Sequence, residues 1–166
     1  MLRLTMLPDF KLADLNGHER PFDDFLADFN VILMTHTPDA CSHSSDELLR
    51  SFLAEGRGVE GASAHGIEIR SHDAFCKSCC GPHLVVQGRE IITICDSGSW
   101  IRRLWGVESD AWIMIVNRGR HVLDDGPLAE IERLAMQFSL DVALSPLRTP
   151  RAPPRHCHEG RRGTAA

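Results

Sequence analysis

The stretch Val31-Ile-Leu-Met-Thr-His-Thr-Pro-Asp-Ala-Cys41 indicates how the whole chain folds. Its first four residues are all apolar, which is typical of a strand that is covered on both faces. Pro38-Asp39 then predicts a turn, and Ser42 to Glu55 has apolar residues at helical spacing. Cys41 is therefore expected at the start of a helix, where unpaired N–H groups and the helix dipole stabilise a thiolate. This position makes Cys41 a candidate nucleophile.

Composition places the chain among ordinary globular proteins. The 166 residues are 43% hydrophobic and 25% charged, which fits a single domain with a substantial core. The longest apolar runs are too short to cross a bilayer, so no membrane partner is expected. The first ten residues do not form a convincing secretory signal, and we expect a cytoplasmic protein.

Charge is distributed unevenly along the chain. The net charge is −5, but residues 147–166 contain five Arg and one Glu, which leaves −9 for the rest. An acidic body has no electrostatic footprint for nucleic acid, so we expect no nucleic-acid partner. From Pro146 onward the chain is rich in Pro, Arg and Gly without periodicity. We therefore predict a domain over residues 1–145 and a basic disordered tail over 146–166.

The other elements are predicted from the same patterns. A hairpin is expected at residues 10–15 because Asn16-Gly17 follows an alternating run. The pattern also predicts strands at 67–69, 91–94, 112–116 and 121–123, and helices at 21–26, 100–105 and 127–140. Residues 71–80 fit either a helix or a loop. This order predicts an α/β fold, a thioredoxin-like three-layer sandwich with a central mixed sheet, an N-terminal β-hairpin and a disordered C-terminal tail.

Several local motifs resemble those of one protein family, in the expected order. They are Leu7-Pro-Asp-Phe-Lys-Leu-Ala-Asp-Leu-Asn-Gly17, Val31 to Cys41, Ile69 to Phe75, Cys95-Asp-Ser-Gly98, Leu104-Trp-Gly-Val107 and Trp112 to Gly119. Together they cover roughly residues 7–142 and resemble the redoxins, in particular the peroxiredoxins of the alkyl hydroperoxide reductase and thiol-specific antioxidant family. The chain would be a divergent member.

This resemblance implies a thiol peroxidase or related thiol oxidoreductase. Cys41 aligns with the peroxidatic cysteine, whose thiolate attacks a hydroperoxide and becomes a sulfenic acid. The family places a threonine three residues before that cysteine; Pro38 holds that position here, and Thr37 is the candidate hydroxyl. The implied partners are a peroxide or disulfide substrate, a thioredoxin-like reductant and a second copy in a homodimer, with no cofactor and no metal. The family's arginine could come from Arg102, Arg103 or Arg118, if the fold brings one close.

A second cluster of thiols lies at Cys76, Cys79 and Cys80, with His83 nearby. One of these cysteines could resolve a Cys41 sulfenic acid by forming a disulfide. The C-x-x-C spacing of Cys76 and Cys79 also fits a shared metal ion, and the thiols could equally be inert. Cys95 follows an apolar strand pattern and is expected to be a core residue.

Two further functions remain open on the sequence alone. The first is a redoxin scaffold without catalysis, which binds a metal or senses redox state through the Cys76 to His83 cluster, with or without His156-Cys-His158. The second is a copper chaperone of the same fold, although Ser45 stands where its second cysteine would be.

Overall fold

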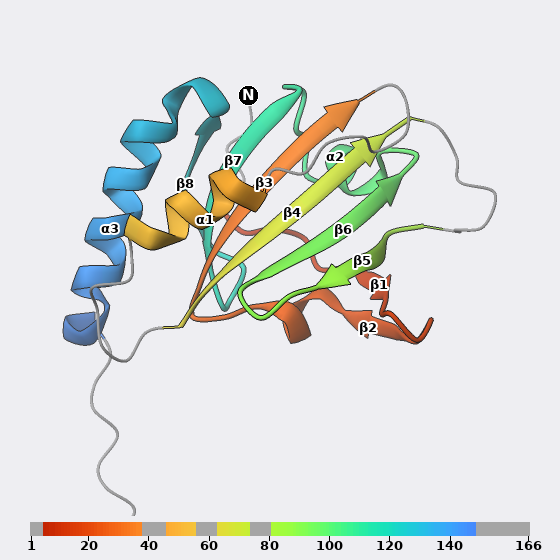
Figure 1. The fold of residues 1–166 in the computed structure, drawn as a ribbon, viewed down its shortest axis with the longest axis horizontal. Helices are drawn as coiled ribbons and strands as arrows, with labels where there is room; N and C mark the ends of the chain where they lie inside the picture. Colours follow the sequence, from red (N-terminus) through yellow and green to blue (C-terminus); the bar gives the residue numbers. More distant parts are fainter. Residues whose placement is uncertain (1–4, 38–45, 56–62, 74–80, 149–166) are drawn as a thin grey trace, which may run out of the picture.

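A mixed sheet of eight strands lies at the centre of the protein (Figure 1). The computed structural model describes residues 5–37, 46–55, 63–73 and 81–148. The strands are β1 (Lys11–Ala13), β2 (Glu19–Pro21), β3 (Phe29–Thr37), β4 (Ala64–His72), β5 (His83–Gln87), β6 (Ile91–Ser97), β7 (Ala111–Asn117) and β8 (Val122–Pro127). The helical segments are η1 (Phe22–Phe25), α1 (Asp46–Glu55), α2 (Trp100–Leu104), η2 (Leu128–Glu130) and α3 (Ile131–Arg148). The strand order is β2-β1-β5-β6-β4-β3-β7-β8.

Strand β3 is central, as its apolar run predicts. It pairs in parallel with β4 along its whole length and antiparallel with β7 on its other side. Strand β4 in turn pairs in parallel with β6. The side chains of Val31, Ile32, Leu33 and Met34 are all buried, because both faces of the sheet are covered at this point.

The sheet separates two apolar layers (Figure 1). Helices α1 and α3 cover one face and pack on Val31 and Leu33, with Phe52 and Phe138 in contact between the helices. Helix α2 and the N-terminal segments cover the other face. This second layer consists of Ile32, Met34, Ile67, Ile69 and Ile94 of the sheet together with Phe10, Phe22, Ile101 and Trp105. The predicted three-layer α/β sandwich is confirmed.

The described elements also confirm the N-terminal hairpin, which pairs β1 with β2, and the antiparallel return of β8 along β7.

Strand β5 was not predicted from the sequence, although Leu84-Val-Val86 is an apolar run between two glycines. It pairs antiparallel with β6 through a bulge and meets β1 at one residue. Because β5 is short and most of its side chains are exposed, it lacks the alternation that marks a half-buried strand.

The closing helix is longer than predicted. The apolar stripe predicts its end near Leu140, whereas α3 continues to Arg148 and passes Pro146 in its last turn. The predicted boundary between domain and tail at residues 145 and 146 thus falls inside a helix, and residues 149–166 lie outside the described part of the chain. None of the helices in the described residues is long and apolar enough to cross a membrane.

Candidate functional site at the carboxyl edge of the sheet

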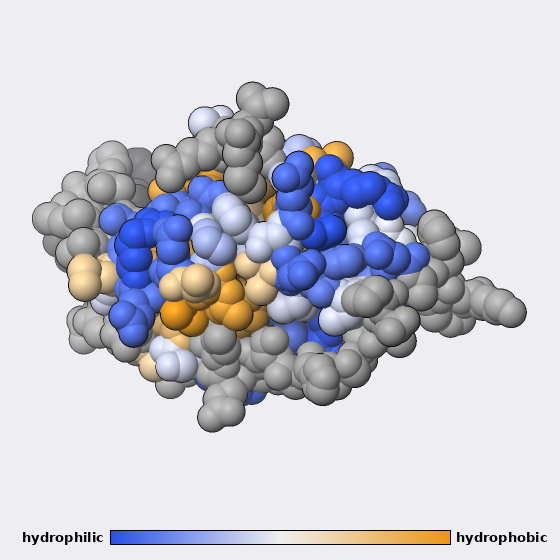
Figure 2. Space-filling model, turned by 90° about the horizontal axis from the view of Figure 1, so that it is seen from above, coloured by the Kyte–Doolittle hydropathy of each residue, from blue (hydrophilic) through white to orange (hydrophobic). Residues whose placement is uncertain are grey.

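The parallel strands β3, β4 and β6 end at one edge of the sheet, which we call the carboxyl edge. Thr37, His72 and Ser97, the last residues of these strands, lie side by side in register. Figure 2 shows the molecule from above, the side towards which these strands point in Figure 1, and hydrophilic residues cover much of its right half. Polar side chains at the carboxyl ends of parallel strands are the usual location of binding sites in open α/β sheets.

Four of the five predicted catalytic residues, Cys41, Cys76, Cys79 and Cys80, lie outside the described residues. Thr37 is described: it is the last residue of β3 and is half-buried at the carboxyl edge. The chain enters residues 38–45 from Thr37 and residues 74–80 from the end of β4. The two segments that carry the predicted cysteines therefore leave the sheet from neighbouring strand ends.

The face of the sheet under α1 carries polar residues near this edge. Strand β4 presents Glu68, Arg70 and His72 to this face, because these residues alternate with the apolar Ile67 and Ile69. Sequence analysis did not single out any of the three. The sequence did contain a signal for them: polar residues occupy every second position of this strand, and the apolar Ile67 and Ile69 alternate with them.

Glu68 is fully buried and forms an ion pair with Arg70. The Arg70 Nη2 to Glu68 Oε2 distance is 3.0 Å, and Thr93 Oγ1 on β6 donates a hydrogen bond to the same oxygen over 3.3 Å. A buried carboxylate needs such partners, because it loses its hydration on folding. Arg70 is thus a cation on the α1 face of the sheet, two residues before the end of β4.

Cys95 lies on this same face and contacts His72. The His72 Nε2 to Cys95 Sγ distance is 3.1 Å, within hydrogen-bonding range for sulfur, and both residues are buried. The prediction that Cys95 is a core residue is confirmed by its burial. The contact with an imidazole was not predicted, because it depends on the register between β4 and β6.

A second polar group, on the α2 side of the carboxyl edge, is centred on His36. Its Nε2 lies 3.0 Å from Asp73 Oδ1 and its Nδ1 lies 3.4 Å from Asp110 Oδ1. Ser99 Oγ donates a hydrogen bond to Asp73 Oδ1 over 3.0 Å. This His36 cluster connects the end of β3 to three other segments. Asp73 follows β4, Ser99 precedes α2 and Asp110 precedes β7. The cluster holds in place the strand end from which residues 38–45 begin.

Asp73 in the His36 cluster gives a prediction for pH dependence. Hydrogen bonds from His36 and from Ser99 lower the pKa of Asp73 below its ordinary value of 3.8. A carboxyl group with a lowered pKa in the folded state stabilises the fold above its unfolded-state pKa and loses that contribution as the pH falls through the folded-state value. The stability advantage of the wild type over Asp73→Asn should therefore be constant above pH 3.8 and shrink below it.

Urea unfolding between acidic and neutral pH measures this difference. Glu132→Gln, which removes an exposed carboxylate on α3, is the control for the loss of one charge. A difference between wild type and Asp73→Asn that stays constant through the acidic range would contradict the role given to the hydrogen bonds on Asp73.

The arginines considered as partners of Cys41 lie in different places. Arg118 pairs with Asp28, which precedes β3, and so lies at the opposite end of the sheet from the carboxyl edge. Arg102 on α2 donates hydrogen bonds to the carbonyl groups of Glu108 and Ser109, in the connection to β7. Arg103 is exposed on α2. Arg70 on β4 is a further cation near the edge, and it was missed from the sequence.

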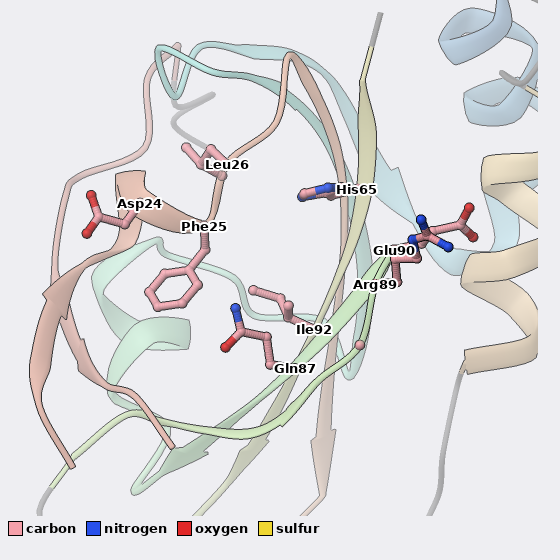
Figure 3. Close-up of a pocket in the computed structure, with 9 residues that line it drawn as sticks. Asp24, Phe25, Leu26, His65, Gln87, Arg89, Glu90 and Ile92 are labelled. Atoms are coloured by element: carbon pink, nitrogen blue, oxygen red, sulfur yellow. The ribbon is translucent and has the colours of Figure 1, made fainter. Parts of the chain in front are cut away.

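A small pocket lies at the other end of the sheet (Figure 3). Its volume is about 170 Å³, and Phe25, Leu26 and Ile92 line it together with His65 and Gln87. Its lining also includes Gly88 and the charged residues Asp24, Arg89 and Glu90. The pocket is smaller than typical ligand sites of about 300–1,000 Å³. It contains none of the predicted catalytic residues.

The described residues contain no group of three or more His, Cys, Asp or Glu side chains that could hold a metal ion. His83, the one described member of the predicted metal cluster, approaches the carbonyl oxygen of Gly81 with its Nδ1 at 3.3 Å. The other predicted members, Cys76, Cys79, Cys80 and His156-Cys-His158, lie outside the described residues.

Comparison with known proteins identifies the fold. No protein-family model and no curated protein matches the sequence. Among solved structures, yeast Sco1 is similar with a TM-score of 0.55 at 13% identity, covering 89% of this chain and 99% of Sco1. Copper-bound ScoI from Arabidopsis thaliana has a TM-score of 0.55 at 10% identity, covering 83% and 98%. A candidate thiol:disulfide interchange protein, DsbE from Chlorobium tepidum, has a TM-score of 0.52 at 15% identity, covering 82% and 95%.

These similarities span almost the full length of each solved structure, and they show that the chain has the thioredoxin-like fold of the redoxins. The fold predicted from the order of elements and from the family motifs is thereby confirmed. At such low identities the similarity concerns the fold alone, because one fold can carry unrelated sites.

Proposed function

We propose that this protein is a thiol-dependent oxidoreductase of redoxin type, which reduces a peroxide or a disulfide through the thiolate of Cys41. One observation supports this proposal most directly. The central strand β3 ends at Thr37, four residues before Cys41, and α1 begins at Asp46, five residues after it. Cys41 is thus in the connection from the central strand to the first helix of a thioredoxin-like fold.

The chemistry follows from the thiolate. With a hydroperoxide, the Cys41 sulfur attacks the terminal oxygen, the O–O bond breaks, and the products are Cys41 sulfenic acid and an alcohol or water. With a disulfide, the same sulfur displaces one thiol and forms a mixed disulfide. The Thr37 hydroxyl at the end of β3 is our candidate donor to the substrate.

A second thiol must then return Cys41 to its reduced state. We propose Cys76, Cys79 or Cys80 for this step. The register of Thr37 opposite His72 supports this choice, because the segments that carry the two sets of cysteines begin on adjacent strands. Such strands lie about 4.8 Å apart. The resolving thiol displaces water from the sulfenic acid and forms a disulfide, which a thioredoxin-like protein reduces.

This cycle requires a compartment in which thiols stay reduced, and we propose the cytoplasm. The six cysteines of the chain fit this setting.

The proposal is tested by mixing the fully reduced, metal-free protein with hydrogen peroxide in a stopped-flow instrument. Mass spectrometry of the quenched samples then locates the oxidised cysteine. We expect Cys41 to be oxidised first and faster than an ordinary free thiol, and a disulfide to Cys76, Cys79 or Cys80 to follow. Slow oxidation by peroxide with fast reaction of Cys41 towards a small disulfide would assign the protein to disulfide exchange. Slow reaction of Cys41 with both would refute the proposal.

A further inference from the structure

We propose that Cys95 and His72 form a second thiol nucleophile, which exchanges with disulfides independently of Cys41. The starting observation is the 3.1 Å distance between His72 Nε2 and Cys95 Sγ. A cysteine this close to an imidazole can pass its proton to the ring and become the thiolate, which is the reactive form of the side chain.

The residues that lie beside Cys95 in the sheet are polar. Arg70 on β4 and His83 on β5 are both in register with Cys95, one on each side of it. Directly opposite residues share one face of a sheet and have Cβ atoms about 5 Å apart. Cys95 thus lies in a row between the His83 imidazole and the Arg70 guanidinium, which is itself paired with the buried Glu68 carboxylate on the same face. A cysteine that only fills the core has apolar neighbours instead.

His72 provides a second, independent indication of a ligand. Its side chain is buried, with 5% exposed, and its Nδ1 has no hydrogen-bond partner within the described part of the structure. Buried polar atoms are almost always paired, so an exception calls for a group that the resting protein lacks. With Nε2 directed at the sulfur, Nδ1 is the atom of the couple that has no hydrogen-bond partner among the described residues. Polar groups beside a disulfide, such as a peptide carbonyl, are suitable partners.

The pair lies close to the carboxyl edge of the sheet. Cys95 lies two residues before the end of β6, and 8% of its surface is exposed. Its register neighbours Arg70 and His83 are only half-buried, so this row of residues extends to the surface.

The exchange begins with a proton transfer. The Cys95 thiol transfers its proton to His72 Nε2, and the resulting thiolate attacks one sulfur of the disulfide. A bond forms between Cys95 Sγ and that sulfur while the original S–S bond breaks. The leaving thiolate takes the proton from the His72 imidazolium and departs as a thiol. One disulfide is thus exchanged for another: Cys95 ends in a mixed disulfide with one half of the substrate, and the other half leaves as a thiol.

The test uses the full chain with Cys41, Cys76, Cys79, Cys80 and Cys157 replaced by serine, so that Cys95 is the only thiol. The probe is dithiodipyridine, a small disulfide whose thiopyridone product is followed by absorbance. The rate is measured against pH in this parent, in the parent with His72→Asn, and in the parent with His121→Asn. His121 is an exposed histidine in the turn between β7 and β8, at the opposite end of the sheet, and is the matched control.

Ionisation sets the size of the expected effect. Two pH units below its pKa an ordinary thiol is only about 1% thiolate. A Cys95 that is ionised by His72 would therefore have about a hundredfold larger thiolate fraction at the same pH. The weaker nucleophilicity of a more acidic thiolate removes about half of that gain on a logarithmic scale. We therefore expect the parent and His121→Asn to react about tenfold faster than His72→Asn in weak acid, and all three to converge at alkaline pH.

Convergence at alkaline pH would show that access to Cys95 is unchanged, so the difference in acid would measure ionisation alone. Equal rates for the parent and His72→Asn at every pH would overturn the proposal, as would a Cys95 that reacts only after unfolding in urea. If the substituted parent fails to fold, the same comparison in the wild type, with mass spectrometry of the Cys95 peptide, decides the question. Because Cys41 is absent from the parent, a negative result would leave the proposed function untouched.

Discussion

Replacing Cys41 with serine should reduce turnover of hydrogen peroxide by at least about a hundredfold. The sulfur is the atom that is oxidised in the proposed cycle, and a serine hydroxyl cannot replace a thiolate in that role. Residual consumption should equal that of ordinary free thiols, because five other cysteines remain in the chain. The measurement is steady-state turnover with a thioredoxin-like reductant in excess.

Cys157→Ser is the matched control for this prediction. It makes the same thiol-to-hydroxyl change outside the predicted domain and should leave turnover unchanged. Turnover by Cys41→Ser at the wild-type rate would remove Cys41 from the mechanism. The Cys95 and His72 couple would then be the nucleophile to examine next.

Replacing Asp96 with alanine should lower the free energy of unfolding by about 3 kcal/mol. Asp96 is fully buried at the end of β6, and its carboxylate accepts three hydrogen bonds. The backbone N–H of Ile101 donates over 2.8 Å, the backbone N–H of Arg102 over 3.0 Å and Ser71 Oγ over 2.7 Å. Alanine would leave three donors without their acceptor, two of them in the first turn of α2.

Ser71→Ala is the graded control, because it removes only one of the three hydrogen bonds and should cost about 1 kcal/mol. Urea unfolding monitored by circular dichroism measures both variants. An Asp96→Ala variant that is no less stable than Ser71→Ala would show that the carboxylate does not hold the start of α2. The expected loss is a large part of the roughly 5–15 kcal/mol that stabilises a domain of this kind.

Asp96 also gives a physical reason for one motif of the redoxin resemblance. In Cys95-Asp-Ser-Gly98 the aspartate lies one residue before the end of β6 and accepts hydrogen bonds from N–H groups in the first turn of α2. Gly98 has a φ of 73° and Ser99 a φ of 53°, so the chain turns sharply between the two elements. Glycine suits this position, because residues with a Cβ rarely adopt a positive φ.

The sequence by itself determined the elements and most of their order. The apolar run at residues 31–34 identified the central strand, because strands covered on both faces are typically continuous apolar runs. Asn16-Gly17 identified the hairpin through its turn, and the spacing of Leu134 and Phe138 identified the closing helix. These signals are local, so they can be recognised without knowing which segments pack together. Strand β5 was missed because its few residues are mostly exposed.

Only the tertiary structure decided which polar residues meet. His36, Asp73, Ser99 and Asp110 are far apart in the sequence, and they form one cluster because four connections converge at the carboxyl edge. The sequence indicated that Cys95 is buried, but the register of β4 against β6 brought His72 to its sulfur and Arg70 to its side. A shift by one residue would turn each of these side chains to the other face. Strand register arises from packing of the whole sheet, and no local pattern in the chain specifies it.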